Sequence, residues 1–149
     1  MGLFWPQIDR NKTLRASSGN LTATETTAER DTSHYLTVTI TLNVEDLVMP
    51  DADDEVDFYF QTKLNGVWMD VANVHFANAQ EPISVATRLI KIGPLATGVS
   101  TITPTDGTLA DNTVAAIPLG EAIRIKTAVT GASAPTYAYN AKVTGYTAN

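Results

Sequence analysis

Residues 56–76, VDFYFQTKLNGVWMDVANVHF, decide the fold of this chain. An Asn65-Gly66 pair lies at the centre of the stretch, between two runs rich in Val and aromatic residues, and this pair favours the type I′ turn of a β-hairpin. The residue pairs that such a turn predicts are Leu64 with Val67, Thr62 with Met69, Phe60 with Val71 and Phe58 with Asn73. Nearly all the aliphatic and phenyl groups then share one face, which is the expected core face.

The other face of the predicted hairpin is mixed in character. Its pairs are Lys63 with Trp68, Gln61 with Asp70 and Tyr59 with Ala72. Lys63 can lie over the Trp68 ring in a cation–π contact worth about 0.5–1 kcal/mol. His75 is expected opposite Val56 as a half-buried, hydrogen-bonded histidine, and we expect the face as a whole to meet solvent.

Period-two alternation extends the strand prediction along the chain. In residues 34–43 every second side chain is aliphatic and the others are Thr or Asn, so one face is buried and the other is wet. Further strands are expected at residues 21–27, 83–92, 122–130 and 136–147. Residues 93–120 are rich in Gly, Pro and Thr, which predicts a long excursion with short strands near residues 99–103 and 113–117. The pattern favours an all-β fold, a single antiparallel β-sandwich that is jelly-roll-like.

Length and composition agree with one domain and argue against several classes of protein. A chain of 149 residues can bury roughly 70% of the surface that it exposes when unfolded. Cysteine is absent, which excludes disulfides and thiolate sites and suits maturation in a reducing cytoplasm. A net charge of -6 argues against a nucleic-acid partner, and we expect neither a signal peptide nor a membrane span.

The first twenty residues differ from the rest and predict an extended N-terminal arm over residues 1–20, followed by the sandwich over residues 21–149. The arm combines an apolar patch with a basic run, whereas acidic residues gather between Glu45 and Asp57. Its expected partner-binding residues are Leu3, Phe4, Trp5, Ile8, Arg10, Lys12 and Arg15. Because Pro6 and the basic run interrupt any strand pattern, we expect the arm to anchor in a partner rather than in its own core.

The sequence offers no arrangement of residues that is typical of a catalytic centre. Ser33 and His34 are neighbours, but adjacent strand residues point to opposite faces, so they would not meet as nucleophile and base. No HxH, HxxxH or HExxH spacing is present for a metal ion. We therefore expect no enzyme activity, no catalytic residues, no cofactor and no metal.

The acidic run at residues 51–57 is a weak alternative for a metal site. Asp51, Asp53 and Glu55 match the first three ligand positions of a calcium loop, but the central Gly and the final Glu of such a loop are missing. A solvated turn is the favoured interpretation. A third alternative is that these acids receive the basic arm of a neighbouring subunit.

Four aromatic residues, Tyr59, Trp68, Tyr137 and Tyr139, offer a stacking platform for sugars if they share an outer sheet face. Packing in cross-strand pairs is the more common arrangement of such residues, and it is the favoured interpretation.

The segments SSGNLTATETT (17–27), YLTVTITLNV (35–44), DFYFQTKLNGVWMDVANVHF (57–76) and IRIKTAVTGASAPTYAYNAKVTGY (123–146) carry a resemblance in pattern. Over most of residues 17–149 the chain resembles the small β-sandwich virion proteins of tailed bacteriophages, especially the head decoration, or cement, proteins. Similar closing strands occur in other phage head and tail proteins.

The resemblance implies a structural protein, made in the host cytoplasm, that binds the outer surface of a phage capsid in the virion and stabilises it. Its implied partners are the major capsid protein and further copies of itself, as a homotrimer. Members commonly use extended N-terminal segments for attachment, which residues 3–15 match by position and character. The alternatives are a phage tail or baseplate protein and a carbohydrate-binding β-sandwich module.

Overall fold

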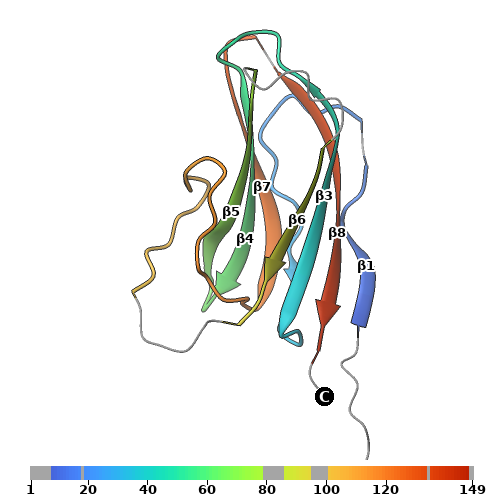
Figure 1. Ribbon diagram of the computed structural model, residues 1–149, viewed down its shortest axis with the longest axis vertical. Coiled ribbons are helices and arrows are strands. Elements are labelled where there is room, and N and C mark those ends of the chain that lie inside the picture. The colour runs from blue at the N-terminus through green and yellow to red at the C-terminus, as the bar shows by residue number, and fades with distance from the viewer. Residues whose placement is uncertain (1–7, 18, 79–85, 95–100, 134, 148–149) are drawn as a thin grey trace, which may run out of the picture.

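The computed structural model describes residues 8–17, 19–78, 86–94, 101–133 and 135–147, which form two β-sheets packed face to face (Figure 1). The strands are β1 (Ile8–Arg15), β2 (Arg30–Asp31), β3 (Thr37–Val48), β4 (Glu55–Leu64), β5 (Val67–Ala77), β6 (Ala86–Ile92), β7 (Ala122–Thr130) and β8 (Thr136–Tyr146). The strand order is β1-β8-β3-β6 in one sheet, called sheet A here, and β2-β7-β4-β5 in the other, called sheet B. The predicted all-β sandwich is confirmed.

The pairing of the strands is that of a jelly roll. β1 pairs with β8, β2 with β7, β3 with β6 and β4 with β5, and all four pairs are antiparallel. One long hairpin that is rolled up on itself produces this order, which is the double Greek key of eight-stranded jelly-roll domains.

The core lies between the two sheets and follows from the alternation seen in the sequence. Along β3, the aliphatic residues from Val38 to Val44 are buried and alternate with half-buried Thr and Asn residues. Phe58 reaches across from sheet B, and its ring lies edge-on to Tyr139 and Tyr137 with centroids 5.2 and 5.9 Å apart. Burial of each such side chain contributes about 1.5–3 kcal/mol, so this interface is the main source of stability.

The β4–β5 hairpin has the predicted register next to its turn. Leu64 lies opposite Val67, as expected, and the pairs up to Gln61 with Asp70 also match. Asn65 and Gly66 have φ angles of 50° and 80°, as a type I′ turn requires at both central positions.

A β-bulge at Val71 then shifts the register, which corrects the rest of the prediction. Beyond the bulge the pairs are Phe60 with Ala72, Tyr59 with Asn73, Phe58 with Val74 and Asp57 with His75. The extra residue moves Ala72 and Val74 to the core side and turns His75 outward, opposite Asp57 rather than Val56.

The sandwich begins earlier in the chain than predicted. Residues 8–15, expected to be part of a separate arm, form the edge strand β1 and pair with β8 from Ile8 opposite Tyr146 to Arg15 opposite Ala141. Two register shifts interrupt the pairing, and Leu14, which lies in the second of them, is buried in the core. The bulges explain why the sequence shows no alternation here. The described part of the predicted arm thus includes a strand of sheet A, and the boundary at residues 20 and 21 stays a prediction.

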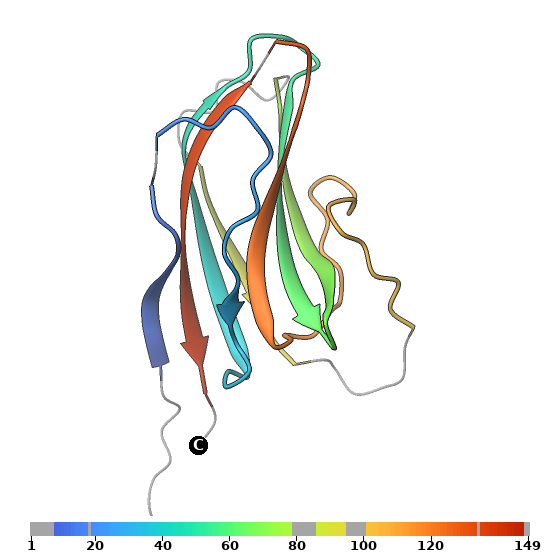
Figure 2. The ribbon, with the colours of Figure 1, turned by 180° about the vertical axis from the view of Figure 1, so that it is seen from behind.

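Two segments predicted to contain strands instead lack regular strand pairing. Residues 21–27 make only isolated bridges, Leu21 with Tyr137 of β8 in sheet A and Thr26 with Lys126 of β7 in sheet B, and pass along β7 in Figure 2. In the described part of the excursion, residues 101–120, the single bridge joins Val114 to Ala72 of β5. Among the described residues, no helix has the length and apolarity needed to cross a membrane.

A close backbone approach fixes the end of the sandwich where β1 begins and β8 ends. A Cβ added to Gly145 of β8 would overlap the ring of Tyr35, so the ring lies directly against the backbone. The Tyr35 hydroxyl donates a hydrogen bond of 2.5 Å to Asp9 of β1. Burial and this bond raise the pKa of Tyr35 to about 12, and the same bond lowers the pKa of Asp9.

Candidate functional site

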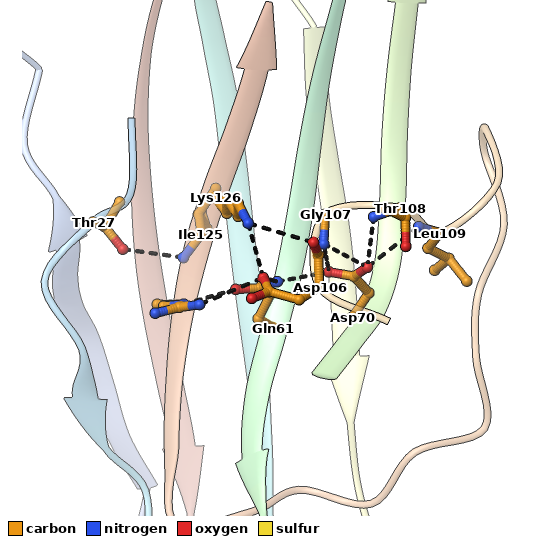
Figure 3. A network of polar contacts seen from close by, with 10 residues as sticks. Thr27, Gln61, Asp70, Asp106, Gly107, Thr108, Leu109, Ile125 and Lys126 are labelled. Carbon is orange, nitrogen blue, oxygen red and sulfur yellow. Dashed lines mark hydrogen bonds and ion pairs between the residues drawn. The ribbon is translucent and has the colours of Figure 1, made fainter. Parts of the chain in front are cut away.

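The outer face of sheet B holds a polar network that fastens the excursion to the sheet (Figure 3). The Asp70 carboxylate of β5 accepts hydrogen bonds from the backbone N–H groups of Gly107, Thr108 and Leu109, at 2.9 to 3.2 Å. It also accepts one of 2.7 Å from the Gln61 side chain. Since Asp70 is fully buried, each of these charge-assisted bonds is shielded from water.

Asp106 completes the network from the side of the excursion. Its carboxylate accepts hydrogen bonds from Gln61 at 2.8 Å and from Lys126 at 2.9 Å, and these bonds lower its pKa in that order. Arg124 lies 3.6 Å from the same oxygen and donates a 2.7 Å bond to Gln61. The charges of the network therefore hold a loop in place, which is a structural arrangement.

The edge of sheet B is covered by the same excursion. The backbone N–H groups of Asp70 and Asn73 donate to the backbone carbonyls of Thr105 and Thr113. The backbone N–H of Ala115 donates to the Val71 carbonyl. An exposed β5 edge would be a site for unwanted pairing, so this cover closes it.

A second cluster lies further along the same face, where the bulge has turned His75 outward. Its ligand-type atoms, from Glu55, Asp57 and His75, lie within 4.8 Å of one another. His75 Nδ1 is 2.8 Å from Asp57 Oδ1, and His75 Nε2 is 3.6 Å from Asp111 of the excursion. Asp57 and His75 are both buried, while the Asp111 side chain is 63% exposed. We call Glu55, Asp57, His75 and Asp111 the acid–histidine cluster.

Tyr59 reports the charge of this region. Burial first, and then the negative charges of Asp57, Asp70 and Asp111, raise the pKa of Tyr59 to about 12. A negative potential therefore surrounds the acid–histidine cluster.

The predicted partner-binding residues of the arm separate into different environments. Ile8 is 43% exposed, Arg10 is exposed, and Lys12 forms a 3.1 Å ion pair with Asp9. Leu3, Phe4 and Trp5 lie outside the described residues.

Arg15 does not fit the predicted arm, because it belongs to the interior. Its guanidinium forms a 2.9 Å ion pair with Glu25, donates to the Tyr139 carbonyl at 2.7 Å and lies 4.3 Å from the Tyr139 ring centroid. With 8% of its surface exposed, it is not available to a partner in this conformation.

The remaining candidate residues from the sequence analysis do not form a common site. Asp51 and Asp53 are exposed, and Glu55 groups with Asp57 and His75 rather than with them. The Ser33 hydroxyl donates to Asp31, and the His34 ring lies 3.9 Å from that of Tyr35.

The aromatic platform for sugars is not formed. Tyr137 and Tyr139 are fully buried and stack on each other in the core, and Tyr59 is also buried. Trp68 is partly covered by Arg124, whose guanidinium lies 4.0 Å from the ring centroid, and by Lys63 at 5.6 Å. The predicted Lys63–Trp68 contact is confirmed, and packing is the correct interpretation of the tyrosine pair.

The outer face of sheet A differs from that of sheet B, because the described loops leave it uncovered (Figures 1 and 2). We call it the threonine–lysine face, and its outward residues are Thr13 of β1, Thr37, Thr39, Thr41 and Asn43 of β3, Thr87, Leu89 and Lys91 of β6, and Asn140, Lys142 and Thr144 of β8. An open hollow of about 340 Å³ lies on it between Thr37, Thr39, Lys91 and Tyr146.

Sequence reasoning identified the polar side of the hairpin but missed the residues that reach it from elsewhere. Asp106 and Asp111 lie in the excursion, far in sequence from β4 and β5. The available signal was the Asp106-Gly107 pair, which is typical of a tight turn, and Gly107 does have a φ of 74°.

Comparison of the chain with protein-family models, curated proteins and solved structures finds no match in any of the three. A proposal about function therefore rests on the arrangement of the residues themselves.

Proposed function

We propose that this chain is a structural attachment protein of a phage virion, which binds the outer surface of the capsid and stabilises it. The observation that carries the proposal is the threonine–lysine face, a regular and uncovered sheet surface next to edge strand β1. Cross-strand pairs such as Thr41 with Lys142 and Thr39 with Lys91 make this surface polar and closely spaced.

The rest of the molecule is suited to such a role. Hydrogen bonds to Asp70 and Asp106 hold the excursion on sheet B, so a described loop loses little freedom when the protein docks. Repetition of the same contact over a shell then gives strong overall attachment from contacts that are individually weak.

The strand order supports the proposal by analogy. Jelly-roll domains occur among viral capsid proteins and also among lectins. The strand order of this chain agrees with a virion protein, and the proposal itself rests on the exposed face of sheet A.

In this proposal the N-terminal residues also take part in binding the capsid. Ile8, where β1 starts, is an exposed apolar residue at the end of the sandwich. Residues 1–7 continue from it and include Leu3, Phe4 and Trp5, which would act as anchors in the major capsid protein. Association into a homotrimer is part of the same proposal.

The test is co-sedimentation of the purified protein with empty phage capsids that lack it. We expect binding at a fixed ratio to capsid subunits. Thr41→Glu, in the middle of the threonine–lysine face, should weaken binding, whereas the matched control Thr24→Glu, on an exposed residue beside sheet B, should not.

A second variant separates the N-terminal residues from the face. Deletion of residues 1–7 leaves β1 and the buried Arg15 in place, so the domain should stay folded while losing attachment. Failure of the full chain to bind any capsid would overturn capsid decoration and favour a tail or baseplate location. Light scattering of the free protein tests the trimer directly.

A further inference from the structure

We propose that Glu55, Asp57 and His75 form a binding site for a divalent transition-metal cation of the Zn²⁺ type. This inference is independent of capsid attachment. It rests on the geometry of the acid–histidine cluster, on its outer shell of hydrogen bonds and on a buried oxygen that has no donor.

The three side chains meet because of strand geometry. Glu55 and Asp57 are two residues apart on β4, so both project from the outer face of sheet B. His75 joins them because the bulge at Val71 places it opposite Asp57. Without the extra residue, the side chain of His75 would point into the core.

The distances between the three side chains fit a shared metal ion after a small movement of one side chain. Zn²⁺ binds imidazole nitrogen and carboxylate oxygen at about 2.0–2.2 Å, so two of its ligand atoms in tetrahedral geometry lie roughly 3.3 Å apart. Asp57 Oδ1 and His75 Nδ1 are 2.8 Å apart, and the full set of three lies within 4.8 Å. Glu55 is only half-buried, so in the proposed site its side chain is the one that moves to close the set.

The surrounding residues resemble the outer shell of a metal site. The side-chain NH₂ group of Asn73 donates a 3.0 Å hydrogen bond to Asp57 Oδ1, which orients the carboxylate. If Nδ1 of His75 is the ligand atom, Nε2–H faces the Asp111 carboxylate at 3.6 Å. Metal-binding histidines almost always present their other N–H to such an acceptor.

A separate observation is a buried acceptor without a donor on Asn73, the residue whose side-chain nitrogen contacts Asp57. The side-chain oxygen of Asn73 is buried and has no hydrogen-bond partner among the described residues. Buried polar atoms without a protein partner are rare, and a bound ion or an ordered water commonly satisfies them.

The local charge favours a cation over an anion. Three carboxylates, those of Glu55, Asp57 and Asp111, surround one imidazole, while Arg124 and Lys126 are engaged with Asp106. The mixed set of imidazole and carboxylates selects Zn²⁺ over Ca²⁺, because Ca²⁺ prefers six to eight oxygen ligands. A bound cation would join β4 and β5 to the excursion through Asp111.

The test is isothermal titration of the chelator-treated full chain with Zn²⁺, and with Ca²⁺ in parallel. We expect one Zn²⁺ per chain and much weaker Ca²⁺ binding. His75→Gln and Glu55→Gln should each weaken Zn²⁺ binding by about tenfold or more, and Asp111→Asn by about tenfold.

Two matched controls address adventitious binding. His34→Gln removes the other histidine of the chain, and Asp53→Asn removes an exposed acid two residues before Glu55, so both variants should bind Zn²⁺ like the parent chain. Circular dichroism confirms that each variant is folded, and Glu55→Gln is the decisive one because its side chain is not fully buried. Absence of Zn²⁺ binding by the parent chain, or equal loss in His34→Gln and His75→Gln, would overturn the proposal; the cluster would then be an ion pair between sheet and loop.

Discussion

At the scale of the residue, Arg15 shows how a charged side chain can belong to the interior. It pairs with Glu25, donates to two backbone carbonyls and lies over the Tyr139 ring. Arg15→Met should lower the free energy of unfolding by about 2–3 kcal/mol, because Glu25 loses its ion pair and the Tyr139 carbonyl loses the bond from the guanidinium. Urea unfolding measures this, and the exposed Arg10→Met should change stability by less than about 0.5 kcal/mol. Equal effects of the two substitutions would contradict the interior role of Arg15.

The tyrosines predict how stability depends on alkaline pH. The pKa values of Tyr35 and Tyr59 are raised to about 12 in the folded chain, above the value of about 10 for an unfolded chain. Their protonated forms therefore stabilise the fold fully below pH 10, and this contribution is lost as the pH rises from about 10 to about 12. Denaturant unfolding at a series of pH values should show the loss. In Tyr35→Phe the loss of stability at alkaline pH should be smaller. An unchanged loss would show that Tyr35 does not contribute to it.

At the scale of the element, the excursion depends on one carboxylate. Asp70→Asn replaces one accepting oxygen by an NH₂ group, which is a donor. It would face the backbone N–H groups of Gly107, Thr108 and Leu109, so these donors lose part of their acceptor. Hydrogen exchange at these three amides should become faster, with the free energy of local opening lowered by about 1–3 kcal/mol. Limited proteolysis within residues 101–120 should also become faster. Asp53→Asn, on an exposed turn, is the control, and unchanged protection in Asp70→Asn would show that other contacts hold the loop.

The elements that the sequence predicted well are those with a local signal. The Asn65-Gly66 turn and the alternation in β3 and β7 determine strand and register from neighbouring residues alone. The bulge at Val71 has no such signal, since either register keeps apolar residues on one side for part of the hairpin. Core packing selects it, because the bulge turns Phe76 inward, where its ring lies 5.9 Å from that of Phe58.

The missed elements have tertiary causes. Edge strand β1 is held by pairing to β8 despite two bulges, and such pairing leaves little alternation in the sequence. The acid–histidine cluster needs both the bulge and the fold of the excursion, so of its residues only Glu55 was a metal-ligand candidate in the sequence. Local patterns therefore predicted the jelly-roll class, and long-range contacts determined the site.

At the scale of the whole molecule, the position of β1 predicts two different outcomes of N-terminal truncation. Deletion of residues 1–7 should leave thermal stability nearly unchanged, because β1 remains paired with β8. Deletion of residues 1–16 removes buried Leu14 and Arg15 and exposes the β8 edge, so stability should fall by about 4 kcal/mol or more. Thermal unfolding followed by circular dichroism compares the two. Equal melting of both truncated chains would contradict the assignment of residues 8–15 to the sandwich.

The contact of Gly145 with the Tyr35 ring has an evolutionary consequence. Any larger residue at position 145 would displace the ring, and a Cβ at Gly120 would collide with the Lys63 carbonyl in the same way. These two positions should therefore tolerate almost no change during divergence, while exposed turn residues such as Asp53 drift freely. A distant homologue would be recognised by glycines at these two places, each facing its own neighbour, long after the overall identity of the sequences had been lost.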